Sequence, residues 1–259
     1  MPMLWLVLLT IAGLATGSVG GYLLIKRFGP GAKHAPPAPV QPPAPEPIKP
    51  PPPEVLPGDA MAPSSRCLPG MKLVSGGTFK QGVAPEDPDK MFDDRQLESV
   101  QVASFCIDEY EYPNQIGVRP TVNVSWDQAL QTCGKQGKRL CTEAQWEKAC
   151  KGPGNGRFPY GNDFDANRCN TKDAAGKDRA PADSGHFQDC RSAYKVADLS
   201  GNVAEWTSSP FEDNGVKKIQ KGGASDKPSH AVRCAARSGA VPTELRPTLG
   251  FRCCADVQP

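Results

Sequence analysis

The ten cysteines of this 259-residue chain constrain its fold more than any other feature, because all of them lie beyond residue 66. An even number of cysteines confined to one part of a chain is typical of exported domains, since disulfides persist in oxidising compartments. Zinc is the competing use of clustered cysteines, but the chain lacks paired C-x2-C spacings and has only three histidines. The pattern therefore predicts a disulfide-stapled domain outside the cytoplasm, in the periplasm.

An apolar segment precedes the cysteines by some distance. Residues 3–25 carry no charged side chain, and a helix of that length crosses the roughly 30 Å hydrocarbon layer of a bilayer. A cleaved signal peptide is the alternative, but no basic residue precedes the segment and its length favours retention. We predict a transmembrane anchor over residues 1–28. Gly13, Gly17 and Gly21 form a small-xxx-small ridge, which suits a transmembrane homodimer or is simply tolerated in a lipid-facing helix.

Residues 29–63 are crowded with proline, as in QPPAPEPIKPPPPEVLP. Such a tract lacks amide donors for a helix or a sheet and favours polyproline II. Fully extended, it reaches up to about 100 Å at about 3.1 Å per residue. We predict a spacer between the anchor and a domain over residues 64–259, with a ligand for a proline-binding domain as the alternative.

Two signals disagree about the side of the membrane on which the domain lies. Lys26, Arg27 and Lys33 follow the apolar segment, and the positive-inside rule alone would place the rest of the chain in the cytoplasm. The cysteines favour the extracytoplasmic side. We follow the cysteines, because the charge rule is a bias rather than a requirement.

Regular secondary structure is sparse in the domain. Residues 71–82 (MKLVSGGTFKQG) and 98–112 (ESVQVASFCIDEYEY) alternate apolar and polar side chains as short strands do, with Gly76-Gly77 as a turn. Two helices are predicted over residues 125–136 and 142–150, because Ser125 with Gln128 and Thr142 with Gln145 form capping-box patterns. Beyond these helices the chain is rich in Gly, Asn, Asp and Pro, so long loops there need disulfides or cations to hold them.

Six motifs follow one another along the domain: GKRLCTEAQWEKAC, FPYG, DLSGNVAEWTSS, KGG, RCAARS and GFRCC. In this order they resemble the sulfatase-modifying-factor family, whose type members are formylglycine-generating enzymes. Several ordered motifs are more specific than any single short one. The resemblance implies an α+β fold related to C-type lectins, with a little sheet and two helices inside much ordered irregular chain.

The resemblance also implies what the chain has lost. The enzymes of this family oxidise a sulfatase cysteine to formylglycine with two copper-binding cysteines in the loop after KGG, and soft thiolates suit Cu(I). Here that loop reads ASDKPSHAV, without a cysteine. The serine of the family's GGS is Ala224, and the first tryptophan of its WEW is Ala204. The resemblance therefore implies a degenerate pocket, with no catalytic residue and no copper.

A hydrolase triad is a second possibility at the same loop. Asp226, Ser229 and His230 lie within five residues of one another, but no G-x-S-x-G elbow surrounds the serine, and triads are defined by geometry. We favour solvated loop residues, with His230 exposed. An active oxidase with Asp226 and His230 as unusual copper ligands is the alternative.

By resemblance, two disulfides tie the helices to the C-terminal segment, Cys133–Cys253 and Cys150–Cys234. The other six cysteines do not match the family pattern, and sequence alone does not fix their connectivity. We expect Cys67–Cys106, Cys169–Cys190 and Cys141–Cys254, with a reactive thiol as the alternative for any of the six.

Calcium is the cofactor that we expect. In DLSGNVAEWT, Asp198 and Glu205 flank turn-forming residues, and calcium prefers carboxylate and carbonyl oxygens. The resemblance implies a site made of these two carboxylates and the carbonyls of Gly201 and Val203. The alternative is that these residues only form turns and caps.

A second calcium site is implied in YGNDFDANRCN, at Asn167 and the carbonyl of Arg168, with Asp173 as a further candidate. The run Asp163, Asp165, Asn167 resembles the start of a calcium loop, but Arg168 stands where an EF-hand needs glycine.

The net charge of +2, with basic residues interspersed among acids, gives no indication of nucleic-acid binding. We predict a membrane-anchored, non-catalytic module that binds a protein or a cell-wall ligand. The alternatives are a formylglycine-generating oxidase and a lectin-like binder of cell-wall carbohydrate, because a fold alone does not choose the ligand.

Overall fold

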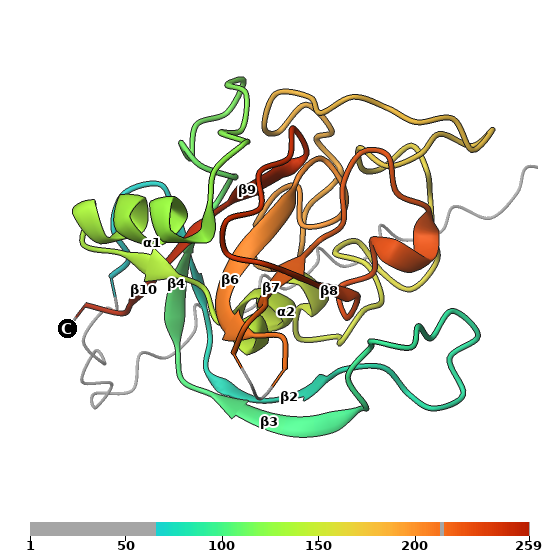
Figure 1. Ribbon diagram of the computed structural model, residues 1–259. Coiled ribbons are helices and arrows are strands. Elements are labelled where there is room, and N and C mark those ends of the chain that lie inside the picture. The colour runs from blue at the N-terminus through green and yellow to red at the C-terminus, as the bar shows by residue number, and fades with distance from the viewer. Residues whose placement is uncertain (1–65, 213–214, 259) are drawn as a thin grey trace, which may run out of the picture. The chain divides into compact units, whose positions relative to one another are not determined.

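The computed structural model describes residues 66–212 and 215–258 (Figure 1). Its elements are β1 (Met71–Val74), β2 (Gly77–Gln81), β3 (Glu98–Val102), β4 (Phe105–Asp108), α1 (Trp126–Lys135), β5 (Arg139–Leu140), α2 (Glu143–Lys151), β6 (Ala204–Pro210), β7 (Lys218–Lys221), the 3-10 turn η1 (Ser229–Ala231), β8 (Arg237–Ala240), β9 (Leu249–Phe251) and β10 (Cys253–Asp256). No helix in the described range is long and apolar enough to cross a membrane. The predicted anchor and spacer, residues 1–63, lie outside that range.

Both predicted helices are confirmed, together with their capping boxes. In α1 the Ser125 side chain accepts from the Gln128 amide and the Gln128 side chain accepts from the Ser125 amide. Thr142 and Gln145 do the same for α2. Because a capping box uses only residues three positions apart, it forms wherever the chain enters a helix and could be read without tertiary information.

The first predicted strand segment divides beside the Gly76-Gly77 pair, where a turn was predicted, and the second segment also divides into two strands. Residues 71–82 contain β1 and β2, and residues 98–112 contain β3 and β4. β1 pairs with β4, whereas β2 pairs with β3, both antiparallel. The break is held where the amide of Gly76 donates to the Ser104 hydroxyl at 2.8 Å. One long bent hairpin therefore contributes to two sheets, which alternation of residue types did not indicate.

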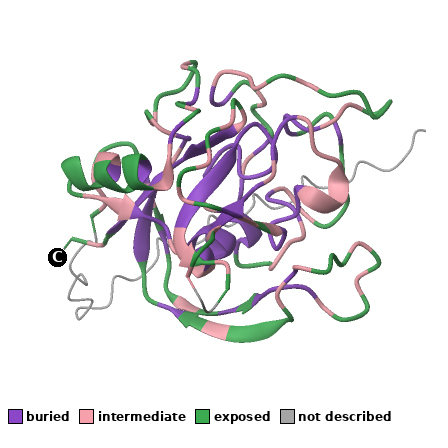
Figure 2. Ribbon diagram, viewed as in Figure 1, coloured by how far each residue is buried: buried purple, intermediate pink, exposed green. Residues whose placement is uncertain are grey.

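The other strands complete one antiparallel sheet and one mixed sheet. One has the order β1-β4-β10-β5 and the other the order β8-β7-β6-β9, in which β6 and β9 run parallel. Figure 2 shows β4, β6 and β7 largely buried and β3 largely exposed. Trp146 of α2 and Trp206 of β6 lie at the centres of two apolar clusters. Between α2 and β6 the chain forms only turns, bends and isolated bridges, as the composition predicted.

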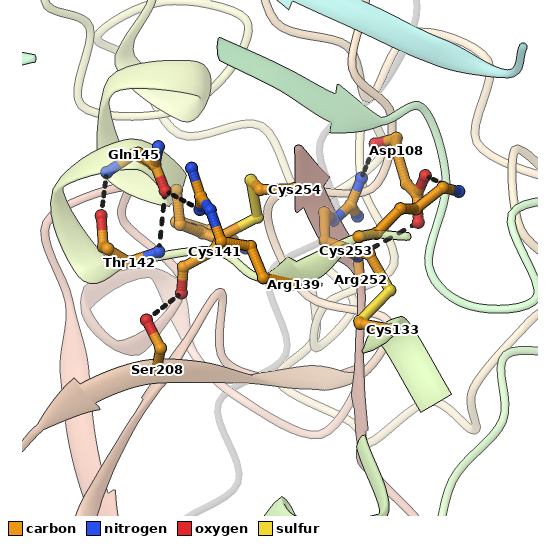
Figure 3. Close-up of a disulfide and its surroundings, with 12 residues drawn as sticks. Asp108, Cys133, Arg139, Cys141, Thr142, Gln145, Ser208, Arg252, Cys253 and Cys254 are labelled. Atoms are coloured by element: carbon orange, nitrogen blue, oxygen red, sulfur yellow. Dashed lines mark hydrogen bonds and ion pairs between the residues drawn. A yellow bond between two sulfur atoms is a disulfide. The ribbon is translucent and has the colours of Figure 1, made fainter. Parts of the chain in front are cut away.

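Disulfides hold these parts together. The five bonds are Cys67–Cys106, Cys133–Cys253, Cys141–Cys254, Cys150–Cys234 and Cys169–Cys190, the same pairs that we expected from the sequence. Figure 3 shows that neighbouring Cys253 and Cys254 of β10 bond to opposite sides, to Cys133 of α1 and to Cys141 after β5. The last strand is thereby fixed to both helical segments.

Loop length ranks the disulfides by their effect on stability. Cys133 and Cys253 are 120 residues apart in sequence, and Cys169 and Cys190 are 21 apart. In the chain-entropy account a longer closed loop restricts the unfolded chain more. We expect replacement of the first pair by alanines to lower the free energy of unfolding by about 1 to 2 kcal/mol more than replacement of the second. Urea unfolding of both double variants measures the difference; an equal or reversed loss would contradict the entropic ranking.

Candidate functional site

The loop that follows β7 turns back tightly at two glycines. Gly222 and Gly223 have φ values of +85° and +64°, where other residues are strained. A side chain at Gly223 would lie 2.5 Å from the Ala231 carbonyl oxygen. The loop is therefore folded against its own later residues, with η1 closing it.

Ala224 and Ala204, the two small residues predicted in the degenerate pocket, are both buried. Backbone hydrogen bonds fix the chain beside Ala224: the Ser225 amide donates to the Asn202 carbonyl at 3.1 Å, and the Lys227 amide donates to the Ala224 carbonyl at 3.0 Å. All ten cysteines are disulfide-bonded. This loop therefore offers no thiolate to a copper ion.

The structure does not assemble a triad from Asp226, Ser229 and His230. Asp226 forms an ion pair with the neighbouring Lys227 at 3.2 Å. Within the part of the chain that the structure describes, no hydrogen bond joins the three side chains. His230 is half-buried rather than exposed as we expected, because it lies in the turn η1, whose His230 carbonyl accepts from the buried Arg233 at 2.8 Å and holds the turn against the domain. A nucleophile without its base in contact has no activated form.

A second polar centre lies around Arg252, between β9 and β10. Its Nη2 and Nε donate to the two carboxylate oxygens of Glu205 at 2.7 and 2.8 Å. The indole of Trp146 donates to the same carboxylate at 2.6 Å. Arg252 and Glu205 are completely buried, so this pair is a structural element of the core.

Two more buried carboxyl groups face this pair. Glu111 accepts from Asn202 and from Ser184, both at 2.7 Å. Asp198 accepts from the Gly185 amide at 2.6 Å. Burial, and then the negative charge of Asp198, raise the pKa of Glu111 to about 8; burial raises the pKa of Asp198 to about 6. The positive charge of Arg252 acts on all three acidic groups, and that of Arg191 acts on Asp198 as well.

The predicted calcium ligands fit this geometry only in part. Asp198 is buried among acidic groups that a cation would neutralise, and Gly201 and Val203 lie beside it in the chain, also buried. Glu205, however, already accepts from Arg252 and Trp146. Among the described residues no three His, Cys, Asp or Glu side chains are arranged to hold a metal ion.

The second predicted calcium site has an open arrangement. Asn167 and Arg168 are exposed. The Asn167 amide donates to Asp165 at 2.9 Å, and Asp173 accepts from the amides of Ala175 and Lys177 at 2.9 and 2.8 Å. These contacts make turns and bring no further carboxylate to Asn167.

Sequence reasoning missed Glu111 and Arg252 as members of a buried cluster. Arg252 carried a signal, because a charged residue placed between apolar Phe251 and the Cys253-Cys254 pair needs a buried partner. Glu111 carried none, since an acid in the alternating run IDEYEY is typical of an exposed strand.

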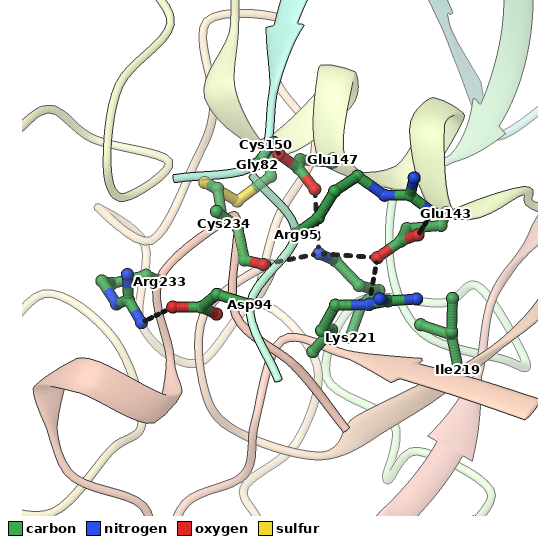
Figure 4. Close-up of polar contacts among 12 residues, drawn as sticks. Gly82, Asp94, Arg95, Glu143, Glu147, Cys150, Ile219, Lys221, Arg233 and Cys234 are labelled. Carbon is green, nitrogen blue, oxygen red and sulfur yellow. Dashed lines mark hydrogen bonds and ion pairs between the residues drawn. A yellow bond between two sulfur atoms is a disulfide. The ribbon is translucent and has the colours of Figure 1, made fainter. Parts of the chain in front are cut away.

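A buried ion-pair network joins α2 to the loop after β7 (Figure 4). Lys221 of the KGG motif donates to Glu147 at 3.0 Å and to the Ala235 carbonyl at 3.2 Å. Glu147 also accepts from Lys151 at 2.9 Å and from the Gly82 amide at 2.7 Å. The loop position thus depends on α2 and on β2.

Comparison with known proteins agrees with this architecture. Residues 112–257 match the family described as "Sulfatase-modifying factor enzyme 1-like domain". The chain is 33% identical over 148 residues to the inactive C-alpha-formylglycine-generating enzyme 2 of Bos taurus, covering 52% of this chain and 49% of that protein. It is 29% identical over 229 residues to the formylglycine-generating enzyme of Thermomonospora curvata, covering 76% of this chain and 67% of that protein. The chain spans about half the length of the first-named relative.

Solved structures resemble the domain in fold. PvdO from Pseudomonas aeruginosa superposes with a TM-score of 0.61 at 21% identity, over 72% of this chain and 94% of that one. Treponema denticola variable protein 1 superposes with a TM-score of 0.60 at 18% identity, over 72% and 94%. These similarities support a fold of the formylglycine-generating-enzyme and C-type-lectin type, with small sheets and few helices.

The raised pKa of Glu111 makes stability depend on pH. Between the pKa of 4.5 of an ordinary glutamate and about 8 in the folded chain, the folded state holds a proton that the unfolded state has lost. Stability therefore falls as pH rises through this window. We expect the melting temperature to fall from about pH 5 to about pH 8, and Glu111→Gln to flatten that fall. Thermal unfolding with a calcium chelator present measures both.

Glu98→Gln, on the exposed strand β3, is the matched control and should keep the pH profile of the parent chain. A constant difference between Glu111→Gln and the parent at every pH would show that Glu111 is ionised in the fold.

Proposed function

The chain belongs to the sulfatase-modifying factor family, and from this premise we propose that its domain is a non-catalytic binding module. The observation that carries the proposal is that the loop after Lys221 contains no cysteine. All ten cysteines of the chain, which lie elsewhere in the sequence, form disulfides. Without a thiolate pair the chain lacks the soft ligands that Cu(I) requires. We further propose that residues 1–28 anchor it in the membrane, that residues 29–63 hold the domain at a distance, and that the domain faces the extracytoplasmic side.

The loop retains a pocket that suits a ligand. A cavity of about 200 Å³ is lined by residues of the loop after β7, of β7 and β8, and of the β2–β3 loop, among them Asp94, Gln220, Gly223 and Arg237. The Gln220 Nε2 donor and the Asp94 Oδ1 acceptor are buried without a partner. An unsatisfied donor and an unsatisfied acceptor in one cavity match a ligand with both groups, as in a polypeptide amide. A protein ligand is therefore the proposed partner.

The test for catalysis is mass spectrometry of a sulfatase-type cysteine peptide incubated with the disulfide-intact full chain, Cu(I) and oxygen. We expect the cysteine to stay unmodified, while an active formylglycine-generating enzyme run in parallel converts it. Conversion of the peptide to an aldehyde by this chain would overturn the proposal. Loss of that conversion in Asp226→Ala and His230→Ala would then identify the replacement ligands.

We propose also that calcium binds at residues 198–205, held by Asp198 and the carbonyls of Gly201 and Val203. Calcium would supply positive charge beside Glu111 and Asp198, two buried carboxyl groups that lie near each other. Glu205 would join the site only by giving up part of its contact with Arg252.

We expect calcium to raise the melting temperature of the full chain, and Asp198→Asn to remove most of that increase. The measurement is thermal unfolding in calcium and in chelator, with Asp165→Asn at the second predicted site as the comparison variant. Equal melting temperatures with and without calcium would remove this part of the proposal.

A further inference from the structure

An unexplained polar arrangement lies beside a second cavity, between the β2–β3 loop and the segment after α2. The cavity measures about 390 Å³, within the range of about 300 to 1,000 Å³ typical of small-molecule sites. Its wall is mainly apolar, with Val83, Ala84, Pro88, Leu97 and Ala235 among the lining residues. Lys151, Asn155, Arg157 and Arg233 line it as well.

Arg233 is buried, with a side chain only 1% exposed, and is not fully used. Its Nη2 donates to Asp94 at 2.7 Å and its Nε donates to the His230 carbonyl at 2.8 Å. Its Nη1 has no hydrogen-bond partner, because the nearest acid, Asp87, lies 3.8 Å away. A buried N–H of a charged group left unpaired is costly, so this donor is available to a ligand.

Arg157 presents a second free donor. Its Nη2 pairs with Asp87 and Asp89 at 3.2 and 2.6 Å, whereas its Nε is buried without a partner. Both guanidinium groups flank Asp87, so they lie close enough together to share one carboxylate. The side-chain oxygen of Asn155 is also buried and unpaired.

The third cation of the cavity offers no donor. Lys151 has three N–H groups, and these are taken by Glu147 at 2.9 Å and by the carbonyls of Lys80 and Gly82 at 2.7 and 2.8 Å. Its effect on a ligand is positive charge alone. Glu86, a lining acid beside Asp87, is exposed to solvent and is screened there.

We propose that this cavity binds a small amphipathic carboxylate. The carboxylate accepts from Arg157 Nε and Arg233 Nη1, and the apolar body lies against Val83, Pro88 and Leu97. Charge-assisted hydrogen bonds of this kind are the strong class, and the apolar wall selects a ligand with a hydrocarbon part. The inference goes beyond the proposed function, because it concerns a different cavity and holds whether or not the domain is catalytic.

Calorimetric titration of the full chain with hexanoate tests the site, with hexan-1-ol as the uncharged probe of equal chain length. We expect hexanoate to bind, and hexan-1-ol to bind at least about tenfold more weakly, since its single uncharged oxygen forms no charge-assisted pair with the two guanidinium groups. Arg157→Gln should weaken hexanoate by about tenfold and leave hexan-1-ol unchanged. Leu97→Asp should weaken both.

Arg119→Gln is the matched control, because Arg119 has a 64% exposed side chain that pairs with Asp183, a residue that does not line this cavity. It should bind hexanoate as the parent chain does. The proposal is overturned if hexanoate does not bind at millimolar concentration, if hexan-1-ol binds equally well, or if Arg157→Gln leaves hexanoate binding intact.

Discussion

The ion pair between Arg252 and Glu205 is the interaction on which the arrangement of the domain depends. Arg252 lies between β9 and β10, strands of different sheets, and its Nη1 donates to the carbonyls of Asp108 and Glu109 at the end of β4. Its Nη2 donates to the Ala197 carbonyl, at the end of the long irregular segment. The guanidinium also donates to Glu205 of β6, whose carboxylate accepts from the indole of Trp146 in α2. Arg252 is thereby linked to both β6 and α2. Removing one partner of such a pair would leave an uncompensated buried charge, which typically costs about 3 to 5 kcal/mol.

The disulfides act on the same strand from both sides. Cys253 and Cys254 follow Arg252 directly and bond to the segments of α1 and β5. Because regular hydrogen-bonded structure is sparse between α2 and β6, the position of that segment follows from the bonds that end on it. Among these bonds are the Cys169–Cys190 disulfide, the hydrogen bond from Asn202 to Glu111, and the hydrogen bond from Arg252 to the Ala197 carbonyl. Long loops can be ordered in this way because the covalent bonds limit the entropy that ordering removes.

The features that the sequence predicted correctly are local or are tied to ordered motifs. Ser125 and Thr142 begin helices because their caps need only the next three residues, and two of the five disulfides follow from the family motifs. The other three pairs agree with our expectation, but the sequence alone did not fix them. The Gly76-Gly77 pair predicted a turn in the first strand segment, but the matching break at Ser104 and the division of the hairpin between two sheets could not be predicted, since only the pairing of distant strands reveals them. Glu111 joins Asp198 across almost ninety residues of chain, and no sequence period marks such a meeting. The calcium and membrane predictions stay predictions.

The two buried arginines show why unpaired polar atoms identify sites in this fold. Arg252 uses its guanidinium donors on three carbonyls and a carboxylate, so its burial is compensated within the domain. Arg233 is equally buried, yet keeps one donor without an acceptor beside an apolar cavity. Both lie in the same scaffold, which contains enough carbonyl and carboxylate groups to satisfy a buried guanidinium completely. Arg233, Arg157, Gln220 and Asp94 each keep a buried polar atom without a hydrogen-bond partner, and all four residues line cavities. The missing partners are therefore expected to come from outside the chain.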